Sequence, residues 1–162
     1  MLTGSYASNL YGRVRSTMDA DLVVLLAAGQ MLKLVRELDA DFYLDSRSLA
    51  EVSEAGREFN AIHKSSGLRV DFFLLGAEAF DRAAFRRRKR KRIFGRSVPV
   101  ISAEDLILAK LRWAKQGGSG RQIEDAAGVF EAQRGRLDLP YLRRWAGVLG
   151  IAGLLDRLRP KE

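Results

Sequence analysis

The 162-residue chain contains no cysteine, which excludes both a disulfide framework and a thiolate metal site. It also lacks any apolar run long enough to span a membrane, and no signal peptide is recognisable. We therefore expect a cytoplasmic protein with no membrane partner. The hydrophobic fraction of 47% is enough for a buried core, and the length fits one domain or a compact pair of subdomains.

Positive charge is concentrated in one short segment. The formal net charge is +8, and an unbroken run of seven cationic residues accounts for nearly all of it. Runs of this kind bind phosphate backbones, or they form a solvated helix end or linker. Both interpretations remain open, with RNA or tRNA as the candidate ligand. The run consists of Arg86, Arg87, Arg88, Lys89, Arg90, Lys91 and Arg92.

Two aspartates one residue apart, Asp19 and Asp21, directly precede the apolar run 22–26. Side chains alternate along a strand, so residues two apart point to the same face. Two carboxylates on one face repel each other and lose hydration, and a hard divalent cation relieves both costs. The alternative is that the pair simply caps a turn before a strand.

A third carboxylate, Asp71, lies within the strand-like apolar run 68–75. A buried carboxylate without a partner is costly, so this side chain should face a partner, a metal or a cleft. The alternative is a structural ion pair with Arg69. Taken together with Asp19 and Asp21, the pattern favours a metal site.

Residues 4–24, GSYASNLYGRVRSTMDADLVV, resemble the opening motif of the nucleotidyltransferase superfamily, whose fold is shared with DNA polymerase beta. That motif has Gly-Ser at a strand-to-helix turn, then D-x-D on the next strand, and a third Asp on a later strand. Residues 59–75 resemble the hairpin that carries the third Asp, and residues 102–130 and 137–155 resemble the helical region. The nearest likeness is to small bacterial nucleotidyltransferase-like proteins, which overlap the AbiEii-type toxins.

The resemblance implies a metal-dependent enzyme that moves a nucleoside monophosphate from a nucleoside triphosphate, with ATP as the expected donor, to RNA, protein or a small molecule. It also implies a toxin–antitoxin or phage-defence role, with a cognate antitoxin as partner. The catalytic and metal-binding residues would be Asp19, Asp21 and Asp71, with Mg²⁺ or Mn²⁺. The nucleotide-binding residues would be Gly4, Ser5, Arg15 and Lys110.

Some of these residues also have ordinary structural interpretations. Gly4-Ser5 opens a helix whose free N–H groups suit a phosphate, but a helix start alone is common. Lys110 is either a triphosphate ligand, as the resemblance implies, or a surface lysine. Arg121 and Asp125 are one helical turn apart and could simply pair with each other.

The hairpin around 64–67 makes a further prediction about the residues that face Asp71. If its loop has four residues, His63 pairs with Leu68 and Asn60 falls opposite Asp71. Asn60 would then share the face of the site, whereas His63, the only histidine, would have a structural role.

The overall pattern predicts an α+β fold, a nucleotidyltransferase-like mixed sheet flanked by helices, with an α/β core over 1–101 and a helical C-terminal subdomain over 102–162. Strands are expected over 1–3, 22–26, 41–44, 59–63 and 68–75, with a small hairpin of 93–94 and 98–101. Helices are expected over 5–11, 30–38, 77–88 and 119–131, with others beginning at 48 and 102 and two short ones after 138.

Two other functions remain open, a catalytically silent nucleotidyltransferase-like binding module and a nucleic-acid-binding protein that uses the basic run 86–92. The first expected strand is only three residues long, whereas relatives of this type carry a helix and a full strand before Gly4. A short strand would leave apolar surface uncovered, so we expect a two-fold homodimer.

Overall fold

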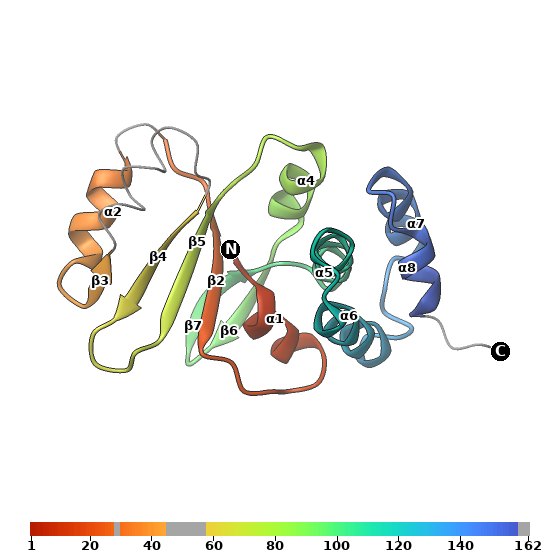
Figure 1. Ribbon diagram of the computed structural model, residues 1–162, viewed down its shortest axis with the longest axis horizontal. Coiled ribbons are helices and arrows are strands. Elements are labelled where there is room, and N and C mark those ends of the chain that lie inside the picture. The colour runs from red at the N-terminus through yellow and green to blue at the C-terminus, as the bar shows by residue number, and fades with distance from the viewer. Residues whose placement is uncertain (28–29, 45–57, 159–162) are drawn as a thin grey trace.

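A seven-stranded mixed sheet with helices around it makes up the computed structural model (Figure 1), which describes residues 1–27, 30–44 and 58–158. The strand order is β3-β4-β5-β2-β1-β7-β6. The strands are β1 (Leu2–Thr3), β2 (Asp19–Val24), β3 (Phe42–Leu44), β4 (Glu58–His63), β5 (Arg69–Leu74), β6 (Lys89–Ile93) and β7 (Arg96–Val100). The mixed α+β fold is as predicted.

Helices occupy most of the rest of the described chain, and they are the only regular elements described after β7. They are α1 (Gly4–Tyr11), α2 (Gln30–Leu38), α4 (Ala79–Arg87), α5 (Ala103–Gly117), α6 (Gly120–Ala132), α7 (Leu139–Val148) and α8 (Ala152–Arg157). Helix α5 begins where the sequence predicts it, because the Ser102 hydroxyl accepts a hydrogen bond from the Asp105 N–H. It ends at Gly118, which has the left-handed conformation typical of a helix C-terminus.

The centre of the sheet fixes the positions of the candidate acidic residues. Strands β2 and β5 are parallel, with Asp21 opposite Asp71, and β4 is antiparallel to β5, with Asn60 opposite Asp71. The His63 N–H donates to the Leu68 carbonyl at 2.8 Å. The predicted hairpin register is therefore confirmed.

One face of this sheet is covered by α2. The residues Phe59, Ala61, Val70 and Phe72 are buried there, and α2 contributes partly buried apolar side chains that pack against them. Ala20, Leu22 and Val24 of β2 belong to the same cluster. Because side chains alternate along a strand, Asp19 and Asp21 must point to the opposite face, away from α2.

A second core joins the remaining helices. Its buried residues come from α1 and α4 as well as from α5, α6, α7 and α8. The segments 1–101 and 102–162 therefore share one hydrophobic core in the described part of the chain. The division at residue 101 stays a prediction about how the chain is organised.

Several expected boundaries change. The strand expected over 22–26 begins at Asp19, so both aspartates lie within β2 rather than before it. The basic run is neither a helix end alone nor a linker, because residues 89–92 form most of β6. The helix expected from residue 48 lies outside the described residues.

None of the described helices is both long and apolar enough to cross a membrane.

Candidate active site

The turn between β1 and α1 is pressed against a carboxylate of β2. Gly4 has φ +61, and a Cβ at this position would lie 1.7 Å from Oδ2 of Asp21. Only glycine avoids that overlap and also adopts the left-handed backbone without strain. The Ser5 backbone N–H, at the beginning of α1, lies near this carboxylate and acts to lower the pKa of Asp21, against the effect of burial. The start of α1 and the Asp21 carboxylate therefore form one compact unit.

Asp21 and Asp71 are side by side on neighbouring parallel strands. Burial raises the pKa of Asp21, and the negative charge of Asp71 raises it further, with a smaller contribution from Asp19. The Ser5 N–H and the positive charge of Lys110 act in the opposite direction but do not cancel the effect. Two carboxylates that disfavour each other's charge are a donor set that a hard divalent cation would stabilise.

Arg69 forms ion pairs with both Asp71 and Asp19, which with Asp21 make up the predicted set of metal ligands. Its Nη2 lies 3.0 Å from Oδ2 of Asp71, and its Nε lies 3.4 Å from Oδ1 of Asp19. The structural pairing of Asp71 with Arg69 is therefore present. Asp19 is half exposed, and the described residues contain no cluster of three acidic, histidine or cysteine side chains arranged to hold an ion. The residues fit a two-carboxylate site, and the three-carboxylate set stays a prediction.

A partly buried ion triad lies beside the start of α1. Asp125 of α6 accepts from Nε of Arg15 at 3.1 Å, from Nη2 of Arg15 at 3.0 Å and from Nζ of Lys110 at 2.8 Å. Burial would raise the pKa of Asp125, but the hydrogen bonds and charges of Arg15 and Lys110 outweigh it and lower that pKa. Lys110 is only 3% exposed, so the surface-lysine interpretation is wrong. Asp125 pairs with these two cations instead of with Arg121.

The triad is connected to the Gly4–Ser5 turn. Nη2 of Arg15 also donates to the Ser5 hydroxyl at 2.7 Å, and Lys110 donates to the Gln122 side chain at 3.1 Å. Acidic and basic groups thus meet around one cavity of about 440 Å³. Its lining includes Ser5, Arg15, Asp19, Asp21, Arg69, Asp71, Arg121 and Gln122.

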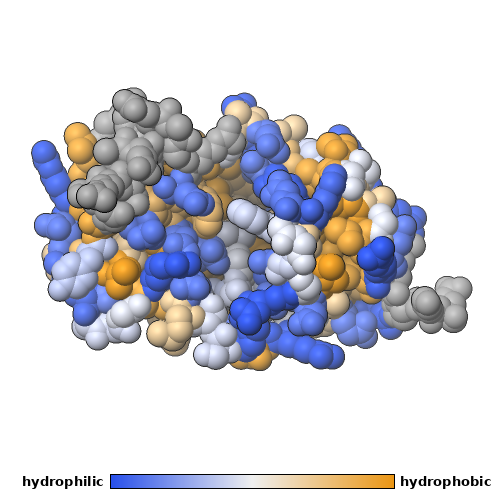
Figure 2. Space-filling view, in the orientation of Figure 1, coloured by the Kyte–Doolittle hydropathy of each residue, from blue (hydrophilic) through white to orange (hydrophobic). Residues whose placement is uncertain are grey.

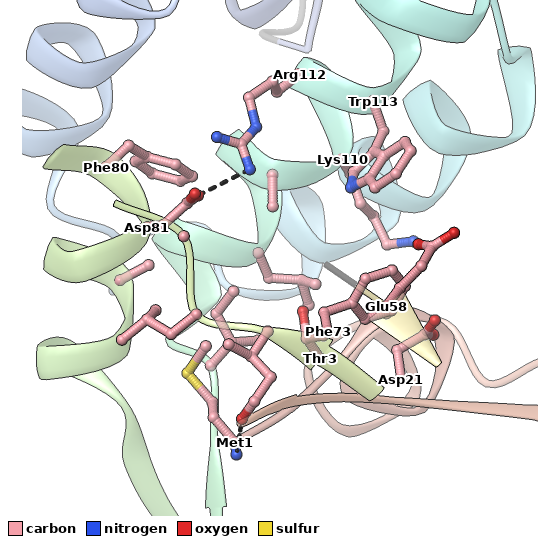
Figure 3. Close-up of a pocket in the computed structure, with 18 of the residues that line it drawn as sticks. Met1, Thr3, Asp21, Glu58, Phe73, Phe80, Asp81, Lys110, Arg112 and Trp113 are labelled. Atoms are coloured by element: carbon pink, nitrogen blue, oxygen red, sulfur yellow. Dashed lines mark hydrogen bonds and ion pairs between the residues drawn. The ribbon is translucent and has the colours of Figure 1, made fainter. Parts of the chain in front are cut away.

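A second cavity, of about 510 Å³, adjoins the first, and Ser5, Asp21 and Gln122 line both. It opens in the middle of the face drawn in Figure 2, between the half with β2 and β5 and the half with α5. Figure 3 shows Asp21 and Lys110 together at one end of this cavity and the Arg112–Asp81 ion pair at the other. The aromatic side chains of Phe73, Phe80 and Trp113 also line this cavity.

Glu58 is a residue of this cavity that the sequence reasoning did not select. It lies opposite Phe73 in the sheet, two residues before Asn60, so it shares the face of Asp71. Figure 3 shows its carboxylate on the same side of the cavity as Asp21 and Lys110. The strand alternation that puts Asn60 on the face of Asp71 puts Glu58 on the same face. Glu58 could therefore have been selected from the sequence.

The basic run divides into two groups. Arg87 pairs with Glu104 and with the fully buried Asp105 and lies over the Tyr141 ring, and Lys91 lies over the Tyr11 ring. Arg87 and Lys91 therefore have structural roles within the fold. The exposed members are Arg86, Arg88, Lys89, Arg90 and Arg92. His63 contacts the Ser66 hydroxyl in the hairpin, consistent with the expected structural role.

No protein-family model and no curated protein matches this chain. Among solved structures, it is similar to an antigenic nucleotidyltransferase-like protein from Paracoccidioides brasiliensis, with a TM-score of 0.53 and 16% identity over 97% of this chain and 82% of that one. It is also similar to the antibiotic-resistance factor ANT(2'')-Ia, with a TM-score of 0.57 and 18% identity over 96% and 84%. The AbiEii-type likeness gains no support from these matches. The chain thus has the fold of nucleotidyltransferase-like proteins.

Proposed function

We propose that the protein is a metal-dependent nucleotidyltransferase that moves a nucleoside monophosphate from a nucleoside triphosphate to an acceptor hydroxyl. The observation that carries this proposal is the contact of the Gly4–Ser5 turn with Asp21, next to Asp71. Chemistry of this kind needs phosphate-binding donors and paired carboxylates within one small space. This site provides both.

The positive groups of the site suit the phosphates. The free N–H groups at the start of α1 and the Ser5 hydroxyl are donors for a terminal phosphate. Arg15 and Lys110 lie beside that turn and share the single charge of Asp125. Two cations against one carboxylate leave a net positive charge, which attracts the triphosphate and the departing pyrophosphate.

The negative groups suit the reacting end of the donor. Asp21 and Asp71, and Asp19 once released from Arg69, would hold Mg²⁺ or Mn²⁺. A bound divalent ion supplies charge neutralisation at the phosphates and acidifies the acceptor hydroxyl. In this proposal Asp71 takes the proton of that hydroxyl. The acceptor oxygen then forms a bond to the α-phosphorus, and the bond to pyrophosphate breaks.

One observation favours a second function, a catalytically silent module that binds nucleotide. Arg69 already forms ion pairs with Asp71 and Asp19, so these carboxylates have a partner without any metal. A silent protein of this kind would bind a nucleoside triphosphate equally well after Arg69→Gln. An enzyme should instead change its metal requirement after the same substitution, because Asp71 and Asp19 become free ligands.

The test is incubation of the purified protein with each α-labelled nucleoside triphosphate, Mg²⁺ or Mn²⁺, and total RNA, protein or small-molecule extract. Transfer of label by the wild type and not by Asp21→Asn supports the enzyme, and ATP is the expected donor. The labelled fraction identifies the acceptor, which also decides between an RNA-modifying toxin and an enzyme acting on small molecules. Calorimetry that detects metal-dependent nucleotide binding without any transfer would favour the silent module.

A further inference from the structure

The hairpin formed by β6 and β7 presents an aromatic side chain at its tip. Phe94 and Gly95 connect the two strands, with φ +46 and φ +75. Two left-handed residues in succession are typical of the tightest hairpin turns, where Asn and Gly are preferred. Phe94 is the one non-glycine residue with positive φ among the described residues, and it is fully exposed at 101%. Both its conformation and its exposure are unfavourable for the free protein.

Cationic side chains surround this tip. Arg92 lies next to Phe94 in the chain and donates from Nε to the Gly95 carbonyl at 3.4 Å, and Arg96 follows the turn. Arg90 lies on the same face of β6 as Arg92, because residues two apart share a face. Among the described residues, none of these three arginines has a carboxylate within ion-pair distance. All three are exposed, so their charge is available to a ligand.

We propose that the β6–β7 hairpin binds single-stranded nucleic acid, with a base stacked on Phe94 and phosphates held by Arg90, Arg92 and Arg96. An exposed aromatic ring offers a stacking platform to any base, and flanking arginines neutralise the backbone on either side. The strand β6 is also the last of the sheet in the described chain, so no neighbouring strand blocks this edge.

The position of the hairpin relative to the cavities favours nucleic acid over a lipid surface. Lys89, at the other end of β6, lies opposite Val100 of β7, and Val100 also pairs with Leu2 of β1, which follows Met1. Met1 in turn lines the 510 Å³ cavity together with Asp21. Cationic residues therefore extend along β6 from the hairpin tip toward the candidate active site. This arrangement suits a polymer that reaches from the hairpin to that site. This last step depends on the proposed function, whereas binding at the hairpin does not.

The test is fluorescence anisotropy with a labelled 12-nucleotide oligo-uridine and the matching oligo-deoxythymidine, in the absence of nucleoside triphosphate. Phe94→Gly keeps the turn geometry and should weaken binding by between about five-fold and a hundred-fold, because one stacked base is lost. Replacing Arg90 and Arg92 with serine should make the slope of log K against log salt shallower by about 1.4, since two phosphate contacts disappear. Preference for RNA or for DNA identifies the physiological strand.

Matched control variants distinguish specific binding at the hairpin from general effects of charge and hydrophobicity. Replacing Arg143 and Arg144 of α7 with serine removes the same charge from another exposed position, and Tyr43→Ala removes an exposed aromatic from the opposite edge strand β3. Neither should change RNA affinity more than two-fold. Equal weakening by these controls, or unchanged affinity of Phe94→Gly, would overturn the proposal. So would Phe94-dependent binding to phosphatidylserine vesicles by a protein that binds neither oligonucleotide.

The active-site variant Asp21→Asn allows oligonucleotide binding at the hairpin to be tested separately from the proposed enzyme activity. Asp21→Asn should bind oligo-uridine as well as the wild type does, and the hairpin variants should bind nucleoside triphosphate unchanged in calorimetry. If the wild-type protein bound the oligonucleotide but transferred no label, only the proposed enzyme would be contradicted. If the wild-type protein transferred label to small molecules but bound no oligonucleotide, only the proposed role of the hairpin would be contradicted.

Discussion

Gly4 and Asp21 approach so closely that a single methyl group on residue 4 would overlap the Asp21 carboxylate. Gly4→Ala should therefore cost more than the strain of a left-handed alanine alone, which is about 1–2 kcal/mol. Gly135 is the matched control, because it has φ +80 and open space where a Cβ would lie. We expect urea unfolding to show that Gly4→Ala loses about 1–3 kcal/mol more than Gly135→Ala, the usual cost of overpacking. Equal losses would mean that the turn moves away from Asp21 freely.

Asp21→Asn should stabilise the protein at neutral pH in a chelator. The raised pKa of Asp21 means that its protonated form is favoured in the folded state, so its contribution to stability is full below its ordinary pKa and is lost as pH rises through the raised value. Asparagine does not ionise, so the variant does not lose this stability as the pH rises. Thermal unfolding should give a higher Tm for the variant at pH 7 and equal values near pH 3.

The control for this experiment is Asp156→Asn, which alters an exposed carboxylate on α8. Its Tm should follow the wild type at both pH values. Adding Mg²⁺ should raise the Tm of the wild type and not that of Asp21→Asn. A destabilised Asp21→Asn protein at pH 7 would show that the carboxylate has a favourable partner that outweighs its burial.

Asp125→Asn should be among the most destabilising polar substitutions in the chain. It leaves Lys110 buried without a counter-charge, and breaking a buried ion pair in this way costs about 3–5 kcal/mol. Lys110→Met should cost less, because Asp125 keeps its two hydrogen bonds from Arg15. Chemical denaturation of the two variants gives the comparison, and a reversed order would contradict the placement of Lys110 in the interior.

The same triad predicts a dependence on acidity. Because the pKa of Asp125 is lowered in the folded state, its stabilisation is present above the ordinary pKa and is lost as pH falls through the lowered value. The unfolding free energies of the wild type and Asp125→Asn should therefore converge in strong acid. A difference between the two proteins that stays constant with pH would point to packing instead of charge.

Phe94→Asn should raise stability by up to about 1 kcal/mol, because asparagine accepts the left-handed conformation more readily than phenylalanine does. The exposed ring makes no buried contact that would be lost. Phe94→Ala is the control, since alanine carries the same Cβ penalty and should give little gain. A large loss on replacing Phe94 would mean that the ring is covered in solution.

The sequence predicted those parts of the fold that depend on local periodicity. Alternation along β2 placed Asp19 and Asp21 on one face, and the length of the turn at 64–67 placed Asn60 opposite Asp71. The beginning of α5 at Ser102 was also recognisable. Each of these depends on residues within a few positions of one another, so a short window of sequence contains the necessary information.

What the sequence did not predict depends on contacts between distant segments. Asp125 is 110 residues from Arg15 in the chain, and the nearer Arg121 at helical spacing was the more obvious partner. Lys110 is a charged residue on an amphipathic helix, where a lysine is ordinarily exposed, so only the packing of α5 against α6 reveals that it is buried. The strand β6 was concealed by its own charges, because seven consecutive cations give no alternation of polar and apolar residues.

The triad around Asp125 has a consequence for how a triphosphate would enter the proposed enzyme. Lys110 and Arg15 are already held in place by an internal anion, at the point where phosphate oxygens would arrive. A ligand can exchange places with Asp125 as their partner, so neither cation has to be drawn from solvent or desolvated anew. In the proposed enzyme Asp125 would therefore act as an internal substitute for the phosphate, and the site would be preorganised in charge as well as in shape.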